Sequence, residues 1–510
     1  MDCDVVIIGG GPVGVSALAR LGQAGVSAIC VDREPSVWTQ ARAVHFDGET
    51  MRSLQTLGVA DEAMSVCKPM ESLRMENEDR ETLFSYPTGF LGPQGWHEDV
   101  MFHQPDMEHL IRDKAMSYPG TELRPGTTLT SFEQADGVVH STVCDADGHT
   151  YVLTSRWLIA ADGATSTVRR LAGIETEKLG NDDPWLVVDG LLERDGDAYP
   201  IDGDMVFLGH HSRPALWVRL PGNRVRMEFK VMPDDDPTEI ITPRALERIS
   251  CGALPVSRFT PDRIAIYTFR ARVATRWRVG NVFLAGDAAH QAPPLFGQGL
   301  CAGMRDIANL SWKIGLVAAG TASPDLLDTY ESERKPHAHY WVAQAATMAE
   351  ILQTTDPNVA AHRDAHIREN PLASAPPPPS PLGPGLHIGD RDPRAGVLAS
   401  QPWLADDRRL DDEVGPRFLV AAPTTMLEAL PSTIRRALSE DAHTAVVTDP
   451  MAVTALAGTG GGAAVLRPDR YVLGIADTTG DLADLVTMIP SVRLTIDGST
   501  LPTPTPAPQS

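Results

Sequence analysis

Several classes of protein are excluded by what this sequence lacks. Its six cysteines are scattered, with no CxxC pair and no spacing typical of a metal site. A disulfide framework and a metal centre are therefore not expected, and a reducing, cytoplasmic setting fits the composition. No run of about 18 apolar residues occurs, so no membrane-spanning segment is expected. The first residues are acidic and punctuated by glycine, so we do not expect a signal peptide.

Positive charge is also scarce. The 44 lysines and arginines are outnumbered by 67 aspartates and glutamates, which gives a net charge of -23 at pH 7. Because no basic cluster offsets this excess, nucleic acid is not an expected partner, and we interpret the charge mainly as an aid to solubility. At 510 residues the chain is too long for one ordinary core, so two or three domains are expected.

What the sequence does contain starts with a dinucleotide fingerprint. A β-branched run over 4–9 predicts a buried strand, and the glycines of a G-x-G-x-x-G motif follow it at Gly9, Gly11 and Gly14. A second predicted strand ends at Asp32, where a carboxylate can hold ribose hydroxyls. The pattern predicts a bound dinucleotide but does not separate FAD from NAD. Arg33 could contact a 2′-phosphate, although a solvated arginine is favoured because Asp32 would repel that phosphate.

A second cradle is predicted where the strand over 282–284 runs into Gly286 and Asp287. The aspartate can accept hydrogen bonds from a polyol chain, and glycines let backbone N–H groups approach a ring closely. The positive end of the helix that begins near Leu300 suits a ring that becomes anionic when reduced, as a flavin does. The turn before this helix contains Pro293, Pro294, Gly297 and Gly299.

Three further positions have two interpretations each. Arg42 could be a surface charge or could reach a pyrophosphate or the flavin edge. Gln104 is either a residue at a helix start or a hydrogen-bonding ligand to a flavin. Asp162 and Gly163 end a predicted strand; such a turn is commonplace, but as the third strand-to-loop junction of this kind it indicates a phosphate-side contact.

Residues 184–275 alternate in the manner of an antiparallel sheet, with one packed face and one face toward a cavity. Such a sheet could cover a small-molecule pocket. Taken singly, each bulky or polar residue on it is more often packed or solvated, so none is assigned as catalytic. The pocket candidates are His210, His211, Trp217, Arg219, Met227 and Tyr267, with Pro294 from the turn above.

The composition predicts the following domains. A discontinuous dinucleotide-binding domain covers 1–72, 100–182 and 276–353; a β-sheet region covers 73–99 and 183–275; a proline-rich linker covers 354–400; a small α/β unit covers 401–498; and a disordered tail covers 499–510.

Together these motifs resemble the single-component FAD-dependent aromatic hydroxylases of the p-hydroxybenzoate hydroxylase type. The resemblance is carried by GGGPVG with Asp32, ARA at Arg42, Gln104, ADGATSTVR and AGDAAHQAPPLFGQGLCAGMRDIANLSWK, in the family's order over 1 to about 345. PWLVVD, RVRMEF and YTFRARVA look most like the 3-(3-hydroxyphenyl)propionate hydroxylase branch, with the polyketide-tailoring branch as its nearest rival. The implied fold is α/β: a Rossmann-like FAD domain with an inserted antiparallel sheet, a long helical segment and a thioredoxin-like carboxy-terminal domain, here lacking CxxC.

The resemblance also implies roles by position. Asp32, with Arg33, would hold the adenosine ribose, although the family usually has Glu where this chain has Asp32. Leu129 would meet the adenine, and Asp162 with Gly163 would serve both FAD and a visiting nicotinamide nucleotide. The other implied cofactor contacts are Gly9, Gly11, Val13 and Gly14 (pyrophosphate), Arg42 and Gln104 (pyrophosphate and ribityl), Gly286 and Asp287 (ribityl), and Pro294, Gly297, Gly299 and Leu300 (flavin ring).

The implied reaction uses NADH or NADPH to reduce tightly bound FAD, and O2 to form a C4a-hydroperoxyflavin that hydroxylates a small phenolic substrate. The phenol must also lose a proton, and the sequence does not identify the base. A homodimer is among the expected states. Of the rivals, a flavin halogenase should carry a WxWxIP element that is missing here, and an NAD dehydrogenase does not require the stretch around Asp287. A non-catalytic flavoprotein that binds an aromatic ligand remains open.

Overall fold

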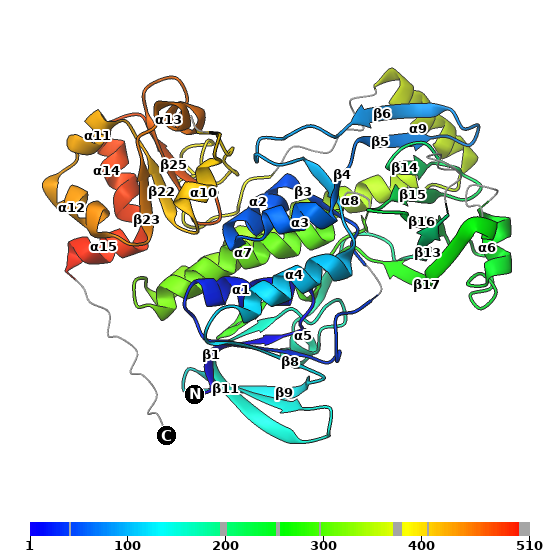
Figure 1. Cartoon of the computed structure of the whole chain (residues 1–510), viewed down its shortest axis with the longest axis horizontal. Helices are drawn as coiled ribbons and strands as arrows, with labels where there is room; N and C mark the ends of the chain where they lie inside the picture. The colour runs from blue at the N-terminus through cyan, green and yellow to red at the C-terminus, as the bar shows by residue number, and fades with distance from the viewer. Residues whose placement is uncertain are drawn as a thin grey trace.

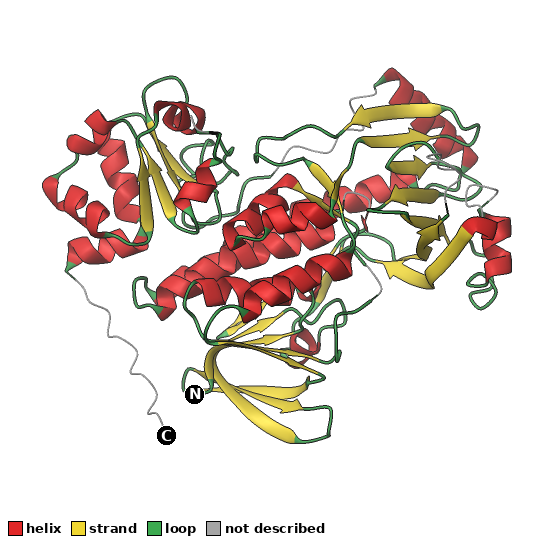
Figure 2. Ribbon diagram, viewed as in Figure 1, coloured by secondary structure: helices red, strands yellow, loops and turns green. Residues whose placement is uncertain are grey.

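The computed structural model describes residues 1–39, 42–193, 201–250, 256–294, 297–370, 380–404 and 407–498. Three parts lie side by side: a central layer of helices over a sheet, a second sheet at one end and a small α/β unit at the other (Figures 1 and 2). None of the helices in these ranges is both long and apolar enough to cross a bilayer.

The central sheet is largely parallel. Its order is β19 (Arg278–Val279), β20 (Val282–Leu284), β11 (Thr150–Ala160), β1 (Cys3–Ile8), β2 (Ala28–Asp32) and β8 (Thr121–Pro125), with β10 (Val138–Cys144) joined to β11 and β9 (Thr128–Ala135) joined to β10. Three helices, α1 (Pro12–Gln23), α4 (Gln104–Met116) and α7 (Gln298–Ala318), pack together as a layer over it (Figure 1). The central strands β1 and β2 are buried on both sides, which is why they are nearly continuous apolar runs.

The register of this sheet brings distant loops together. Ile8 on β1 lies opposite Val31 on β2 and Ala160 on β11, and Ala160 in turn lies opposite Leu284 on β20. Because these four strands are parallel, their carboxyl ends meet at one edge. The glycine turn after β1 and the aspartates that end or follow β2, β11 and β20 therefore converge there.

The second sheet joins two separate stretches of the chain. Its order is β17 (Phe259–Phe269), β13 (Asp183–Leu192), β16 (Arg224–Lys230), β15 (Ala215–Arg219), β14 (Met205–Leu208), β5 (Ser72–Glu76) and β6 (Thr82–Pro87). The antiparallel pairing predicted for 184–275 is confirmed among its own strands, whereas β14 pairs in parallel with β5, which lies outside that range. That pair is formed by strands from the two predicted segments, so no hairpin turn constrains their direction.

The two faces of this sheet differ. One face carries Trp217, Met227 and Val188 into a core closed by α6 (Pro243–Ile249). The opposite face carries Arg226 and Glu228 toward the central part. The side chains alternate because successive residues of a strand point to opposite sides.

Smaller elements complete this part of the fold. They are β3 (His45–Asp47), β4 (Lys68–Pro69) and β7 (Asp99–Met101) in one sheet; β12 (Thr176–Lys178), β18 (Arg272–Ala274) and β21 (His290–Gln291) in another; and α2 (Gly48–Leu57), α3 (Ala60–Val66), α5 (Thr167–Leu171), η1 (Val256–Arg258), η2 (Gly286–Ala288) and η4 (Pro324–Asp328).

The predicted linker over 354–400 is wrong in part. After the long helix α8 (Thr329–Leu352), a further helix α9 (Pro357–Glu369) begins at an Asp356 cap. Arg363 on α9 donates to the carbonyl of Gly209 at 2.7 Å, so α9 packs on the second sheet. Farther on, the backbone N–H of Ile388 donates to the carbonyl of Leu473 at 2.9 Å. Capping and packing thus order parts of a segment whose composition is typical of an extended linker.

The carboxy-terminal unit has the strand order of a thioredoxin-like fold, β23 (Thr444–Val447), β22 (Phe418–Ala421), β24 (Ala463–Leu466) and β25 (Val472–Ala476). Only β22 and β23 pair in parallel. Its helices are α10 (Leu410–Val414), α11 (Thr424–Glu428), α12 (Ser432–Glu440), α13 (Pro450–Ala457), α14 (Thr479–Met488) and α15 (Pro490–Asp497).

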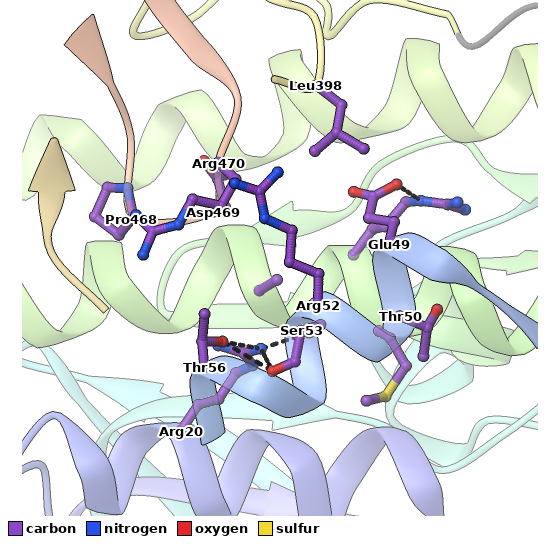
Figure 3. Close-up of a pocket in the computed structure, with 13 residues that line it drawn as sticks. Arg20, Glu49, Thr50, Arg52, Ser53, Thr56, Leu398, Pro468, Asp469 and Arg470 are labelled. Atoms are coloured by element: carbon purple, nitrogen blue, oxygen red, sulfur yellow. Dashed lines mark hydrogen bonds and ion pairs between the residues drawn. The ribbon is translucent and has the colours of Figure 1, made fainter. Parts of the chain in front are cut away.

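Buried ion pairs fix this unit to the central part. Asp411 accepts from Arg52 at 2.6 and 3.1 Å, and it pairs with Arg470 at 3.0 Å. Glu333 on α8 pairs with Lys313 at 2.7 Å and with Arg467 of the small unit at 2.8 Å. Figure 3 shows the narrow polar cavity between the two parts, where Arg52 and Arg470 approach each other from opposite sides. The unit is therefore docked through charges rather than held only by a tether.

Candidate functional site

A pocket of about 280 Å³ opens at the edge where the strand ends converge. It is formed by the turn after β1, the ends of β2 and β11, the start of α4 and the start of α7. The sequence-predicted cofactor residues that line it are Gly9, Gly11, Val13, Asp32, Arg33, Arg42, Gln104, Leu129, Asp162, Gly163, Asp287, Gly299 and Leu300.

The glycines of the fingerprint have separate tasks. Gly9 has a φ of +100°, and a Cβ there would lie 2.4 Å from the carbonyl oxygen of Ala161. A Cβ at Gly14 would lie 1.8 Å from the carbonyl oxygen of Gly9, so Gly14 permits close packing of α1 and does not line the pocket. A Cβ at Gly11 would meet nothing within 4 Å. Gly11 therefore leaves backbone exposed to whatever occupies the pocket.

Asp32 lies at the carboxyl end of β2 and is 9% exposed. Its Oδ1 accepts from the backbone N–H of Glu34 at 3.1 Å, and its Oδ2 lies 3.6 Å from Nη2 of Arg112. Arg112 also donates to the carbonyl of Gly10 at 2.7 Å and pairs with Glu108 at 2.8 Å. Sequence reasoning missed Arg112 and Glu108, although their spacing of four on a predicted helix was a usable signal.

Arg33 points away from a buried role. Its side chain is 59% exposed and lies 3.3 Å from the carboxylate of Glu34. This arrangement matches the solvated arginine favoured by the sequence. Trp38, also missed by sequence reasoning, lines the same pocket and is 41% exposed. A large aromatic ring exposed at a pocket offers a flat surface for a ring-bearing ligand.

Gln104 serves the protein and faces the pocket at once. It is the first residue of α4, and its Oε1 accepts from the backbone N–H groups of Arg42 at 2.9 Å and Ala43 at 3.0 Å. Gln104 is therefore a residue at a helix start that also lines the pocket, and its role as a ligand to a flavin stays a prediction. By holding this backbone, Gln104 fixes the segment that carries the exposed Arg42 side chain to the rim of the pocket.

Two aspartates present unpaired acceptors to the pocket. Asp162 caps α5, because its Oδ2 accepts from the N–H groups of Thr167 at 2.7 Å and Val168 at 3.1 Å. Its Oδ1 is buried and has no hydrogen-bond partner among the described residues. Burial raises the pKa of Asp162 despite these hydrogen bonds. Asp287 is exposed at the wall of the pocket, and desolvation by the surrounding chain raises the pKa of its carboxyl as well. Both groups would gain from hydroxyl donors on a ligand.

Gly286, Pro294 and Gly297 lie beside the pocket rather than in its wall. Gly286 has a φ of +59°, and its N–H donates to Asp306 at 3.0 Å, which fixes the turn. Gly297 caps α7 with a φ of +63°, and a Cβ there would lie 2.1 Å from Nδ1 of His45. Gly299 and Leu300, just after it, do line the pocket, so the amino-terminal end of α7 meets it and favours an anionic group there.

Pro294 belongs to a second cavity, between this turn and the second sheet. It is lined by Trp185, Phe207, Leu208, Pro214, Ala215, Leu216, Glu228, Phe269, Pro294, Leu352 and Gln353. Most of these side chains are apolar or aromatic, and the cavity measures about 10 Å³, room for about one water molecule. Glu228 was missed from the sequence, since its strand alternates like many others.

The remaining pocket candidates are scattered. His210 and His211 lie near Glu78 at the far edge of the sheet, and His211 is 3.3 Å from that carboxylate. Arg219 lies 3.6 Å from Asp204. Trp217 is fully buried in the core on the side of α6, together with Met227, so neither is proposed as a pocket residue.

Among the candidates on strands, only Tyr267 lies on the face of the second sheet that carries Arg226 and Glu228. It stands opposite Trp185, which lines the second cavity, and the guanidinium of Arg263 lies 5.0 Å from its ring centre.

Comparisons with known proteins agree with this geometry. The family model described as "FAD binding domain" matches residues 2–345. A probable NADH-specific resorcinol 4-hydroxylase of Rhodococcus jostii (strain RHA1) is 32% identical over 94% of this chain and 93% of its own length. A 3-(3-hydroxy-phenyl)propionate/3-hydroxycinnamic acid hydroxylase 2 of Burkholderia vietnamiensis (strain G4 / LMG 22486) is 34% identical over 82% of this chain and 78% of its own length.

Solved structures share the fold over nearly the whole chain. The flavin-dependent monooxygenase PieE, in complex with FAD and substrate, has a TM-score of 0.80 at 22% identity and covers 98% of this chain and 99% of its own. Aklavinone-11 hydroxylase with FAD and aklavinone has a TM-score of 0.76 at 24% identity, with coverages of 97% and 99%. The predicted fold class and family are confirmed: the chain belongs to the FAD-binding domain family and is an FAD-dependent aromatic hydroxylase.

Proposed function

We propose that this enzyme hydroxylates a small phenol, either a resorcinol-like compound or a 3-hydroxyphenylpropionate-like acid, with NAD(P)H as the electron donor. The balanced reaction converts a ring C–H, O2, NAD(P)H and a proton into a ring C–OH, NAD(P)⁺ and water. The observation that carries the proposal is the dinucleotide-shaped pocket at the strand ends, together with a separate, largely apolar cavity between the turn at Pro294 and the second sheet. The two relatives named above act on such phenols according to their names.

The first pocket fits FAD. The exposed backbone at Gly11 is open to a pyrophosphate, and Asp32 is placed for a ribose. Asp287 and the unpaired Oδ1 of Asp162 are acceptors for hydroxyl groups of the ligand. When bound, FAD supplies the redox chemistry: it takes electrons from the nicotinamide nucleotide and activates O2. The amino-terminal end of α7 would favour negative charge on a ring bound there.

The nicotinamide nucleotide is proposed to bind in a basic groove next to Asp162. The groove is lined by Ala164, Thr165, Arg169, Arg170, Arg270, Arg272 and Gln291. Such a concentration of arginines is unusual for a chain with a net charge of -23. It offers planar, charged donors to the phosphates of a visiting nucleotide. Arg270 and Arg272 also contact Asp182, at 3.3 and 2.8 Å, which limits their positive field.

We also propose a division of labour among the parts. The central sheet and helices hold FAD, the second sheet with β5 and β6 covers the substrate, and the carboxy-terminal unit stabilises the central part through Asp411 and Glu333. The small unit contains no cysteine between 401 and 498, so disulfide exchange is not part of its role.

The proposal is tested by mixing the purified, FAD-loaded enzyme with NADH or NADPH and a panel of phenols. Oxidation of the nucleotide that is stimulated by a phenol, together with a product 16 mass units heavier, is the expected result. A yellow protein that binds phenols without stimulated oxidation would identify a non-catalytic flavoprotein instead. Turnover of only large polycyclic phenols would favour a polyketide-tailoring role.

A further inference from the structure

A buried carboxylate faces the second cavity from the middle of the second sheet. Glu228 lies on β16 and is 4% exposed. It lines the cavity together with Pro294, Trp185 and Phe269. Its strand neighbour Leu216 stands directly opposite it and lines the same cavity. A single acid thus stands in the wall of a small, largely apolar cavity of about 10 Å³, next to the turn that precedes α7, and the cavity must widen to admit a phenol ring.

The charged groups that face Glu228 leave its carboxylate able to accept a hydrogen bond from a ligand. Asp189 on β13 binds Arg226 through Nε at 2.6 Å and Nη2 at 3.0 Å, and it lies 3.7 Å from Nη1 of Arg263 on β17. Glu228 Oε1 lies 3.7 Å from Nη1 of Arg226, beyond hydrogen-bond distance. That nitrogen donates at 2.7 Å to the carbonyl of Arg42, which lines the FAD pocket.

The surroundings also shift the titration of Glu228 in a useful direction. Burial raises its pKa and the negative charge of Asp189 adds to the rise, whereas Arg226 and Arg263 oppose it. A carboxylate with an ordinary pKa is a weak base for a phenol, and a raised pKa brings it closer to the pH at which proton transfer is effective.

We propose that Glu228 is the catalytic base that accepts the hydroxyl proton of an uncharged phenol in this cavity. The inference rests on the proposed function and names a proton acceptor for it. The O–H bond of the phenol breaks, its electron pair stays on the ring oxygen, and the proton passes to a carboxylate oxygen of Glu228 and later to water. The resulting phenolate has a higher electron density at the ring carbon that becomes hydroxylated. Among the described residues that line the cavity none is cationic, which suits an uncharged ring.

The first test is Glu228→Gln, which keeps the size of the side chain and removes the base. The visible spectrum of FAD and the Kd of resorcinol, followed by its perturbation of flavin absorbance, are expected to stay within about threefold of wild type. The kcat for resorcinol is expected to fall about 100-fold or more. In the wild type, the fall in kcat at low pH is expected to follow protonation of Glu228. In the variant, the fall is expected to follow the pKa of the phenol itself. Glu247→Gln, at an exposed position on α6, is the matched control and is expected to change neither kcat nor its dependence on pH.

A series of phenols of decreasing pKa separates proton transfer from a structural role. The defect of the glutamine variant is expected to shrink toward wild type for the most acidic phenols, because these ionise without help. An equal loss of kcat across the series, or a kcat for resorcinol within threefold of wild type, would overturn the proposal. If the glutamine variant loses FAD, Glu228→Asp is measured instead: it must keep the acid limb that a base sets, and loss of that limb refutes the proposal.

Failure of the proposed function would look different. In that case the wild-type enzyme itself, loaded with FAD, would hydroxylate none of the phenols, before any substitution is made.

Discussion

Replacement of Gly11 by alanine isolates the cofactor pocket from the stability of the fold. Gly11 has φ of -72° and ψ of -177°, which an alanine adopts without strain, and the added Cβ would meet no atom within 4 Å in the cofactor-free protein. The midpoint of thermal unfolding of the FAD-free protein should therefore stay close to that of wild type. When a pyrophosphate is bound against this backbone, the same methyl group would occupy its space.

The expected loss can be estimated from the hydrogen bonds at stake. A hydrogen bond to a charged group contributes about 1.5–3 kcal/mol, so losing one such bond at Gly11 weakens FAD binding by roughly 10- to 150-fold. Kd is measured by titrating the FAD-free protein with FAD and following the quenching of flavin fluorescence. Gly460→Ala is the matched control, because a Cβ at Gly460 also meets nothing within 4 Å but lies in the carboxy-terminal unit.

Two results would refute this reasoning. If Gly11→Ala binds FAD as tightly as wild type, the turn after β1 does not hold the pyrophosphate. If the FAD-free variant unfolds at a much lower temperature while Gly460→Ala does not, Gly11 serves the fold rather than the ligand.

Three further predictions concern charges. Burial alone would raise the pKa of Asp411, but Arg470 and Arg52 lower it to about 2. The ionised carboxylate therefore stabilises the fold above pH 4, and this contribution is lost as the pH falls toward 2. Asp411→Asn should lower the free energy of unfolding in urea at pH 7 by about 2–4 kcal/mol, whereas the control Glu413→Gln should change it little. Asp287→Asn should weaken FAD binding with little change in the unfolding temperature of the FAD-free protein, because the exposed side chain keeps one acceptor oxygen for the ligand hydroxyls in place of two. Arg272→Ala should raise KM for the nicotinamide nucleotide several-fold without changing the visible spectrum of bound FAD.

Local patterns were sufficient to predict the dinucleotide pocket. The fingerprint glycines, Asp32 and Asp287 all follow strands that are short apolar runs, and parallel strands bring their carboxyl ends together. Residues that can be recognised from local sequence patterns therefore lie together at one edge of one sheet. Trp38, which was missed there, carries no local pattern of its own. Arg112 does carry the i,i+4 spacing with Glu108, but its position beside Asp32 depends on a contact between distant segments.

The second sheet was harder to interpret, because β14 and β15 are apolar on both faces. In β15, Leu216 faces the second cavity while Trp217 faces the α6 core, and a shift of one residue would exchange them. Sequence reasoning selected Trp217 for its size and passed over Glu228. The helix α9 was missed for a related reason: proline density dominates 371–384, but the Asp356 cap and the contact of Arg363 with Gly209 lie just before it.

The most direct test of the whole account is a crystal structure of the enzyme with FAD and a phenol bound. The account predicts FAD along the pocket, with its pyrophosphate at Gly11 and its ribityl chain at Asp287, and the phenol hydroxyl within hydrogen-bond distance of Glu228. FAD bound elsewhere, or a phenol that lies outside the chamber beneath Pro294, would contradict it.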